Sequence, residues 1–155
     1  FKKCLDILMK FVVQRVSKAQ IIIDKKKYSS IKKGLLVLIG IEKNDKEEML
    51  DYYAKKIINM RIFNDSNYKM NNSILDIKGE ILVVSQFTLL ANTKKGNRPS
   101  YVNAEKPDLS KYLYRLFCEK LKNYEINIKK GRFGANMELD FINDGPVTIL
   151  LGNEL

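Results

Sequence analysis

GLLVLIGI, the stretch from Gly34 to Ile41, is almost wholly apolar. A run of this kind is typical of a strand at the centre of a sheet whose two faces are both covered, because none of its side chains is suited to water. We therefore predict that this strand is the centre of the fold and that the elements before and after it pack around it.

Further strands are predicted on both sides of this stretch. Lys10–Val16 (KFVVQRV) and Ala19–Asp24 (AQIIID) are rich in β-branched residues, which indicates two strands near a hairpin. The lysines at 25–27 are expected at the solvated end of a hairpin. Glu80–Leu89 (EILVVSQFTL) predicts another buried strand with polar groups at its end, and Ile126–Leu151 supplies the last strands.

Two helices are predicted from apolar positions that recur at helical spacing. The first begins near Asp45, which can cap it with Glu48 in the capping-box position, and ends near Met60. Its apolar residues are Leu50, Tyr53, Ala54, Ile57 and Ile58. The second runs from about Asp108 to Asn123. Its apolar stripe, typical of core packing, contains Leu109, Tyr112, Leu113, Leu116, Phe117 and Leu121.

The order of these elements indicates the fold class. A short strand near Arg61–Phe63 and a polar loop over Asn64–Ser73 complete the pattern. Strands dominate and do not alternate with helices in the ordered way of a Rossmann fold, so we predict an α+β protein. A chain of 155 residues with 45% hydrophobic composition is expected to form a single domain.

The sequence carries no signal for a membrane or for export. No apolar run approaches the ~20 residues that cross a bilayer, and the opening FKKCLDIL is too short in its apolar part for a secretory signal. We expect a cytoplasmic protein with no membrane partner, in which Cys4 and Cys118 are free thiols and not a disulfide.

Histidine is absent from the chain, and the net charge is +10. Without histidine, the usual general base and the commonest zinc ligand are both missing, and we expect no metal and no cofactor. The positive charge suits a polyanionic partner such as RNA. Biased codon usage accounts for the charge equally well, because the basic residues are mostly lysine and are spread along the chain.

Three short segments are candidates for chemistry, and each has an ordinary structural role when taken alone. Ser85–Leu89 (SQFTL) places hydroxyl and amide groups at the end of a buried strand, where such groups commonly satisfy the backbone. Gly131–Asp140 (GRFGANMELD) has glycines flanking Phe133, which suits a bend or close approach to a ligand. Asn143–Thr148 (NDGPVT) is typical of a turn fixed by its proline.

The sequence resembles the D-aminoacyl-tRNA deacylase family, also called D-tyrosyl-tRNA deacylase. The resemblance lies in the order and spacing of three segments, SQFTL, GRFGANM and NDGPVT. The resemblance runs from Met9 to about Leu151, so a deacylase domain is expected over 9–155. Residues 1–8 fall outside the pattern and are expected to be an N-terminal extension without a functional part.

The resemblance implies a deacylase-like fold with mixed, mainly antiparallel sheets curved into a barrel-like shape and two covering helices. It also implies a homodimeric hydrolase that cleaves the ester between a D-amino acid and the 3′-terminal adenosine of tRNA. DNA is not expected as a partner. In such proteins a cis Gly-Pro bond, here Gly145–Pro146, enters the active site of the opposite subunit and excludes L-amino acids by steric conflict. Achiral glycine, as on mischarged tRNA-Ala, is then not fully rejected.

Residue roles follow from the same resemblance. The backbone amides of Phe87 and Thr88 are expected to stabilise the developing negative charge. The residues expected to line the adenosine and aminoacyl pocket are Ser85, Gln86, Phe133 and Met137. A basic loop with Lys94, Lys95 and Arg98 is a candidate for contacts with tRNA phosphates.

Alternatives remain at this point. Thr88 is a candidate covalent nucleophile, although it has no visible base. A sister editing activity with a trans Gly-Pro bond removes small L-amino acids from tRNA. A non-catalytic RNA-binding module is supported by the positive charge alone.

Overall fold

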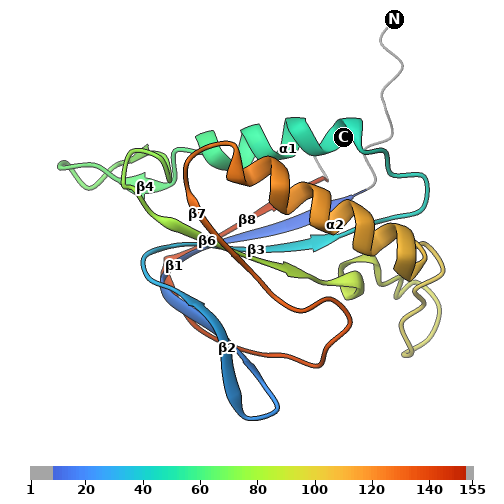
Figure 1. The fold of residues 1–155 in the computed structure, drawn as a ribbon. Helices are drawn as coiled ribbons and strands as arrows, with labels where there is room; N and C mark the ends of the chain where they lie inside the picture. Colours follow the sequence, from blue (N-terminus) through green and yellow to red (C-terminus); the bar gives the residue numbers. More distant parts are fainter. Residues whose placement is uncertain (1–8, 153–155) are drawn as a thin grey trace, which may run out of the picture.

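A curved six-stranded sheet with two helices on one face forms the body of the molecule (Figure 1). The computed structural model describes residues 9–152, so the predicted extension over residues 1–8 lies outside the described residues. Within this range, neither helix is long and apolar enough to cross a membrane. The strands are β1 (Lys10–Ile23), β2 (Lys26–Ile31), β3 (Gly34–Gly40), β4 (Phe63–Asn64), β5 (Met70–Asn72), β6 (Glu80–Ser85), β7 (Asn127–Lys130) and β8 (Glu138–Leu151). The helices are α1 (Glu48–Asn59), α2 (Pro107–Lys122) and the 3-10 helix η1 (Phe87–Leu90).

The sheet is mixed and curls toward a barrel. Its order is β2-β1-β3-β6-β7, and β8 pairs with the other edge of β1. β1 is antiparallel to its three neighbours, whereas β3–β6 and β6–β7 are parallel pairs. The curvature brings β2 beside β7, where the Ser29 hydroxyl donates to the Lys130 carbonyl oxygen at 3.3 Å. The predicted α+β class, with a mixed barrel-like sheet and two helices, is confirmed.

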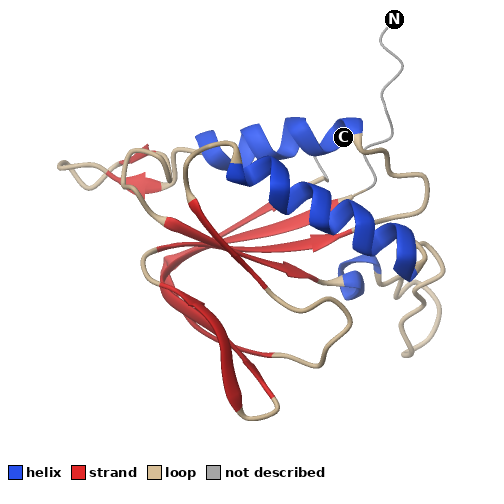
Figure 2. Ribbon diagram, in the orientation of Figure 1, coloured by secondary structure: helices blue, strands red, loops and turns tan. Residues whose placement is uncertain are grey.

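The central strand is covered on both faces, as its sequence predicts. Leu35, Val37 and Ile39 are at most 1% exposed and belong to the core beneath the two helices. Leu36 points to the opposite face and joins a second core with residues of β1, β2 and β6. Figure 2 shows the helices together on one side of the sheet, which leaves the second core to be enclosed by the curling strands.

Both predicted helices are present, but the first is capped differently from the prediction. The apolar residues predicted for α1 are all buried, and the helix ends at Asn59. Asp45 does not cap it: its carboxylate accepts a hydrogen bond from the Glu42 amide at 2.7 Å, and the N-cap residue is Glu47. The loop before the helix therefore uses the carboxylate for its own turn. α2 begins one residue earlier than predicted, at Pro107.

The two strands predicted before β3 are one continuous strand. Exposed Ser17 and Lys18 interrupt the apolar pattern of β1, yet the chain continues there with shifts in its register against β8. The hairpin comes later, at Asp24 and Lys25, which adopt φ of 50° and 63°. The lysine run is at the hairpin end as predicted, whereas the following strand β2 was not predicted because its polar residues obscure the alternation.

Other boundaries also differ from the prediction. The strand predicted over Glu80–Leu89 ends at Ser85, and the chain then turns into η1. The predicted strand near Arg61–Phe63 is displaced to Phe63–Asn64, and the predicted loop after it contains β5. The segment 143–148 lies within β8, but it bulges out of the ladder: Asn143 pairs with Val16 and Thr148 with Gln14, and residues 144–147 between them have no partner on β1. The paired residues on both sides of this bulge keep it within the strand despite its proline.

Candidate functional site

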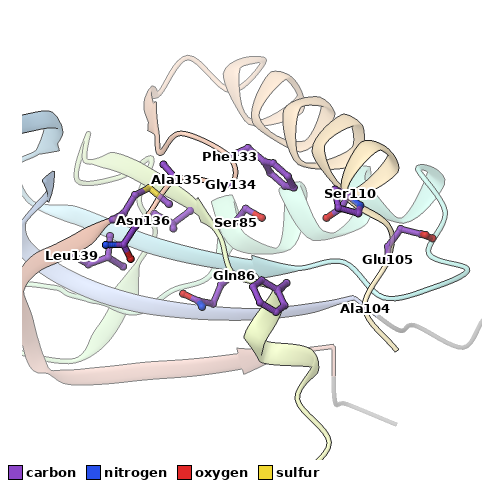
Figure 3. Close-up of a pocket in the computed structure, with 14 residues that line it drawn as sticks. Ser85, Gln86, Ala104, Glu105, Ser110, Phe133, Gly134, Ala135, Asn136 and Leu139 are labelled. Carbon is purple, nitrogen blue, oxygen red and sulfur yellow. The ribbon is translucent and has the colours of Figure 1, made fainter. Parts of the chain in front are cut away.

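A cavity of about 560 Å³ opens where β6 ends, between the start of α2 and the connection from β7 to β8 (Figure 3). It brings together segments that are far apart in the sequence. Figure 3 shows Phe133 and Ser110 on one side of the cavity and Gln86 on the other. The lining residues used below are Ser85, Gln86, Phe87, Glu105, Ser110, Phe133 and Met137.

The end of β6 supplies the polar wall. Gln86 leaves the strand, and its amide still donates to the Ile39 carbonyl oxygen at 2.8 Å. The next amides, of Phe87 and Thr88, begin η1 and therefore have no acceptor within that helix. The Gln86 side-chain amide donates to the Thr88 hydroxyl in a short hydrogen bond. This arrangement leaves two adjacent main-chain donors without a helical acceptor, and the first of them belongs to the cavity-lining residue Phe87.

The connection between β7 and β8 supplies the apolar wall. Phe133 packs against Tyr114 of α2, with ring centroids 6.0 Å apart. The Tyr114 hydroxyl donates to the Val83 carbonyl oxygen at 2.8 Å, and burial strongly raises the pKa of this phenol, so it stays neutral. A Cβ at Gly131 would lie 2.8 Å from the Met137 sulfur, so the glycine lets Met137 approach the backbone closely. Met137 and Phe133 are thus held by packing.

The start of α2 forms a third wall that sequence analysis missed. Glu105 is fixed by its amide, which donates to the Ile41 carbonyl oxygen at 3.0 Å. Ser110 is 7% exposed and lines the cavity from the first turns of α2. Nothing in the local sequence marks these residues, since only the packing of α2 against the sheet brings them to the end of β6.

Several predicted site residues do not line this cavity. Thr88 contacts the lining residue Gln86 without being part of the wall. Lys94, Lys95 and Arg98 lie in an exposed loop between η1 and α2. Gly145 and Pro146 are in β8 and exposed, and the peptide bond between them is cis. Within the described part of the chain, no group of three or more acidic, cysteine or histidine side chains could hold a metal.

Arg15 holds the strand that carries Gly145, and sequence analysis missed it. This arginine is 7% exposed, and its Nε donates to the Asp144 carbonyl oxygen at 3.0 Å. Its Nη1 donates to the Ile62 carbonyl oxygen at 2.8 Å and lies 3.4 Å from the Asn64 side-chain oxygen. An arginine in an apolar strand gives no sequence signal for this role, because its acceptors come from distant segments.

The segment 143–148 is also braced internally. The Asn143 side-chain oxygen accepts a hydrogen bond from the Val147 amide at 3.0 Å, and its nitrogen donates to the Thr148 hydroxyl at 3.0 Å. The asparagine therefore bridges the Gly-Pro pair from one side to the other.

Comparison with known proteins identifies the family. The family model described as D-Tyr-tRNA(Tyr) deacylase matches residues 12–152. The chain belongs to this family. Two curated relatives named D-aminoacyl-tRNA deacylase are similar over nearly their whole length, and both names denote a hydrolase. The protein from Thermosipho africanus (strain TCF52B) is 49% identical over 146 residues, 94% of this chain and 98% of the relative. The protein from Bacteroides fragilis (strain YCH46) is 52% identical over 144 residues, 92% of this chain and 96% of the relative.

Solved structures support the same deacylase fold. One titled c-Myc DNA Unwinding Element Binding Protein has a TM-score of 0.85 and 40% identity, covering 92% of this chain and 97% of its own. Another, a probable eukaryotic D-amino acid tRNA deacylase, has a TM-score of 0.80 at 18% identity, covering 92% and 98%. At that identity the second likeness concerns the fold alone. The predicted resemblance to the deacylase family is confirmed.

Proposed function

We propose that this deacylase hydrolyses the ester between a D-amino acid and the 3′-terminal adenosine of tRNA in the cavity at the end of β6. The observation that carries the proposal is the pairing of two main-chain donors, at Phe87 and Thr88, with the apolar wall of Phe133 and Met137. The adenine base of the terminal nucleotide fits against the side chains of Phe133 and Met137. The ester carbonyl then points toward the main-chain amides of Phe87 and Thr88.

The chemistry uses main-chain groups in place of a histidine. Water attacks the ester carbonyl carbon, and the tetrahedral intermediate carries its negative charge on the former carbonyl oxygen. The amides of Phe87 and Thr88 donate to that oxygen, which stabilises the charge without any shifted pKa. The 2′-hydroxyl of the substrate, or a water that it orients, passes the proton lost by the attacking water to the 3′-oxygen as the bond from that oxygen to the carbonyl carbon breaks, which releases the amino acid and the tRNA. Ser85 and Gln86 hold the substrate by hydrogen bonds.

Chiral selection is assigned to Gly145 and Pro146 acting in the cavity of a partner subunit. The pair is exposed, and its backbone is fixed by Arg15 and Asn143, as a rigid excluding surface requires. An L-amino acid directs its side chain against this backbone, whereas a D-amino acid directs it away. In this proposal no pocket binds the amino-acid side chain, and glycine has no side chain to collide with the Gly145–Pro146 backbone. Glycyl esters on mischarged tRNA-Ala are therefore also accepted.

A homodimer through the outer face of β8 and β1 is part of the proposal. Leu150 on β8 is 58% exposed, and its neighbour on β1 in the sheet is Val12; both alternate with Phe11 and Leu151, which lie in the core beneath the helices. The helices lie on the opposite side of the sheet, so this face is available to a second copy. Covering the apolar side chains of Leu150 and Val12 favours association.

The basic loop is proposed to contact phosphates near the acceptor end of tRNA. Lys94, Lys95 and Arg98 are exposed, and the whole chain carries a net charge of +10. Such charges attract a nucleic acid without reading its sequence. A cytoplasmic location is proposed with this substrate.

The decisive experiment follows ester loss from D-tyrosyl-tRNA and L-tyrosyl-tRNA in parallel. Rapid loss of the D-ester alone supports the proposal. Survival of both esters as long as in buffer, despite tight tRNA binding, would mean a non-catalytic RNA-binding module. Loss of small L-aminoacyl esters, such as L-alanyl-tRNA, with the D-ester intact would mean the sister editing activity.

A further inference from the structure

Two aromatic rings at the mouth of the cavity are exposed and packed against each other. Phe87 is 56% exposed and Tyr101 is 37% exposed. Their ring centroids are 5.0 Å apart, and the ring planes meet at 69°. The next residue, Val102, is 64% exposed. The pair therefore presents a stiff aromatic surface to solvent and is not part of the core.

The surrounding backbone fixes this pair beside the cavity. Phe87 itself lines the cavity from the first position of η1. Tyr101 follows a hairpin closed by Asn92 and Ser100, whose backbone groups exchange hydrogen bonds of 2.8 and 2.9 Å. The Tyr101 carbonyl oxygen accepts from the Ala104 amide at 3.0 Å, and Ala104 lines the cavity. The aromatic surface is thus continuous with the cavity wall.

The same hairpin carries a concentrated positive charge. Lys94, Lys95 and Arg98 are exposed within it, and no acidic residue occurs between positions 92 and 103. Proteins that hold single-stranded nucleic acid combine aromatic rings, on which bases stack, with basic groups that follow the phosphates. Charge and aromatic surface here occur side by side at the entrance of a cavity suited to a terminal nucleoside.

We propose that Phe87 and Tyr101 form a stacking platform for the nucleotide that precedes the terminal adenosine in the single-stranded acceptor end of tRNA. This inference rests on the proposed function, because it places the terminal adenosine in the cavity. The basic hairpin of Lys94, Lys95 and Arg98 contacts the phosphates that lead into it. Recognition then extends beyond the terminal nucleoside without reading base identity, since every base has a face that stacks.

The test compares two esters of D-tyrosine in wild-type protein and a Tyr101→Ala variant. One ester is on adenosine alone, and the other is on the trinucleotide cytidylyl-cytidylyl-adenosine. We expect the variant to raise KM for the trinucleotide ester by roughly 5- to 150-fold, as for the loss of one base–aromatic stack, with kcat unchanged. Hydrolysis of the adenosine ester should be unaffected. Tyr101→Phe should retain the wild-type KM because the ring remains.

The matched control is Tyr68→Ala, because Tyr68 is 88% exposed in the turn between β4 and β5, away from the cavity lining. It should leave KM for both esters unchanged. Equal KM values for wild type and Tyr101→Ala on the trinucleotide would overturn the platform. So would an equal rise in KM on both esters.

Two further measurements distinguish a stacking platform from a dimer contact and from a failure of the proposed function. If Tyr101→Ala changes the oligomeric state in size-exclusion chromatography with light scattering, the ring is covered by a second copy and the platform is wrong. If the wild-type protein cleaves neither ester, the proposed function fails. The platform is then tested by titrating uncharged trinucleotide and uncharged adenosine, where only trinucleotide binding should weaken in Tyr101→Ala.

Discussion

The buried guanidinium of Arg15 donates to the carbonyl oxygen of Asp144 at 3.0 Å, one residue before Gly145. A side chain from β1 thereby fixes the main chain of β8 at the segment assigned to chiral selection. The same guanidinium also reaches the Ile62 carbonyl oxygen, which ties the segment to the end of the connection after α1. The rigidity of the proposed excluding surface is therefore built by three distant parts of the chain.

Replacing Arg15 with methionine should lower selectivity as well as stability. Arg15→Met keeps the apolar stem but leaves the buried Ile62 carbonyl oxygen and the partly buried Asp144 carbonyl oxygen without their donor, a cost of about 1–3 kcal/mol in the free energy of unfolding. We expect the ratio of L- to D-tyrosyl-tRNA hydrolysis to rise, because the Asp144–Gly145 backbone is released. Lys27→Met, an exposed change on the neighbouring strand β2, is the control. A destabilised variant with an unchanged ratio would limit Arg15 to a structural role.

Gly145 should not tolerate a side chain. It adopts φ of 128°, and a Cβ would lie 2.9 Å from both the Arg15 Nη2 and the Val147 Cγ2. Gly145→Ala should therefore displace Arg15 and cost about 1–3 kcal/mol in urea unfolding. Gly96→Ala serves as the control for backbone conformation, because Gly96 has φ of 66° and nothing within 4 Å of an added Cβ. If Gly145→Ala is no less stable than the control, the close packing around Gly145 is not required.

Thr88 should be replaceable without loss of the chemistry. Thr88→Val removes the hydroxyl, which accepts a hydrogen bond from Gln86, but keeps the backbone amide. We expect kcat for D-tyrosyl-tRNA to fall by no more than about tenfold, since the amide supplies the stabilisation of the oxyanion. A covalent nucleophile would instead show a loss of several orders of magnitude. Single-turnover kinetics on both proteins distinguishes the two.

Cys118 should make the protein less stable in alkali. Burial raises the pKa of its thiol to about 11 from an ordinary 9.0. Below pH 9 the thiol is protonated in both states and has no effect. As the pH rises from 9 to 11, the unfolded thiol ionises while the folded one does not, so the free energy of unfolding falls by about 1.4 kcal/mol per pH unit at most.

Urea unfolding at pH 8 and pH 10.5 checks this prediction. Wild type should lose roughly 1–2 kcal/mol more stability between the two conditions than Cys118→Ala, which lacks the thiol. Cys4 is present in both proteins, so its ionisation cancels. Equal losses would show that Cys118 ionises as readily in the folded protein as in the unfolded one.

An element of the fold could be predicted from the sequence where its signal lies within that element's own residues. The apolar run of β3 and the helical spacing of α1 each record a burial pattern within one element, so both were predicted correctly. The prediction divides β1 into two strands because exposed Ser17 and Lys18 look like a turn. The strand is continuous because β3 and then β2 pair with one edge of it and β8 pairs along the other edge.

The candidate site divides in the same way. Ser85, Gln86, Phe87, Phe133 and Met137 were named from motifs, and the structure brings them into one cavity. Arg15, Glu105 and Ser110 were not predicted, because the role of each depends on contacts with, or a cavity shared with, other elements of the fold.

The sequence alone determined the α+β class, the central strand and the family motifs, since apolar periodicity and short motifs are properties of contiguous residues. The tertiary structure alone decided which segments meet: the curl of the sheet, the wall added by α2 and the guanidinium beneath Gly145. The physical reason is that burial and hydrogen-bond satisfaction depend on neighbours in space, and a single sequence does not name those neighbours.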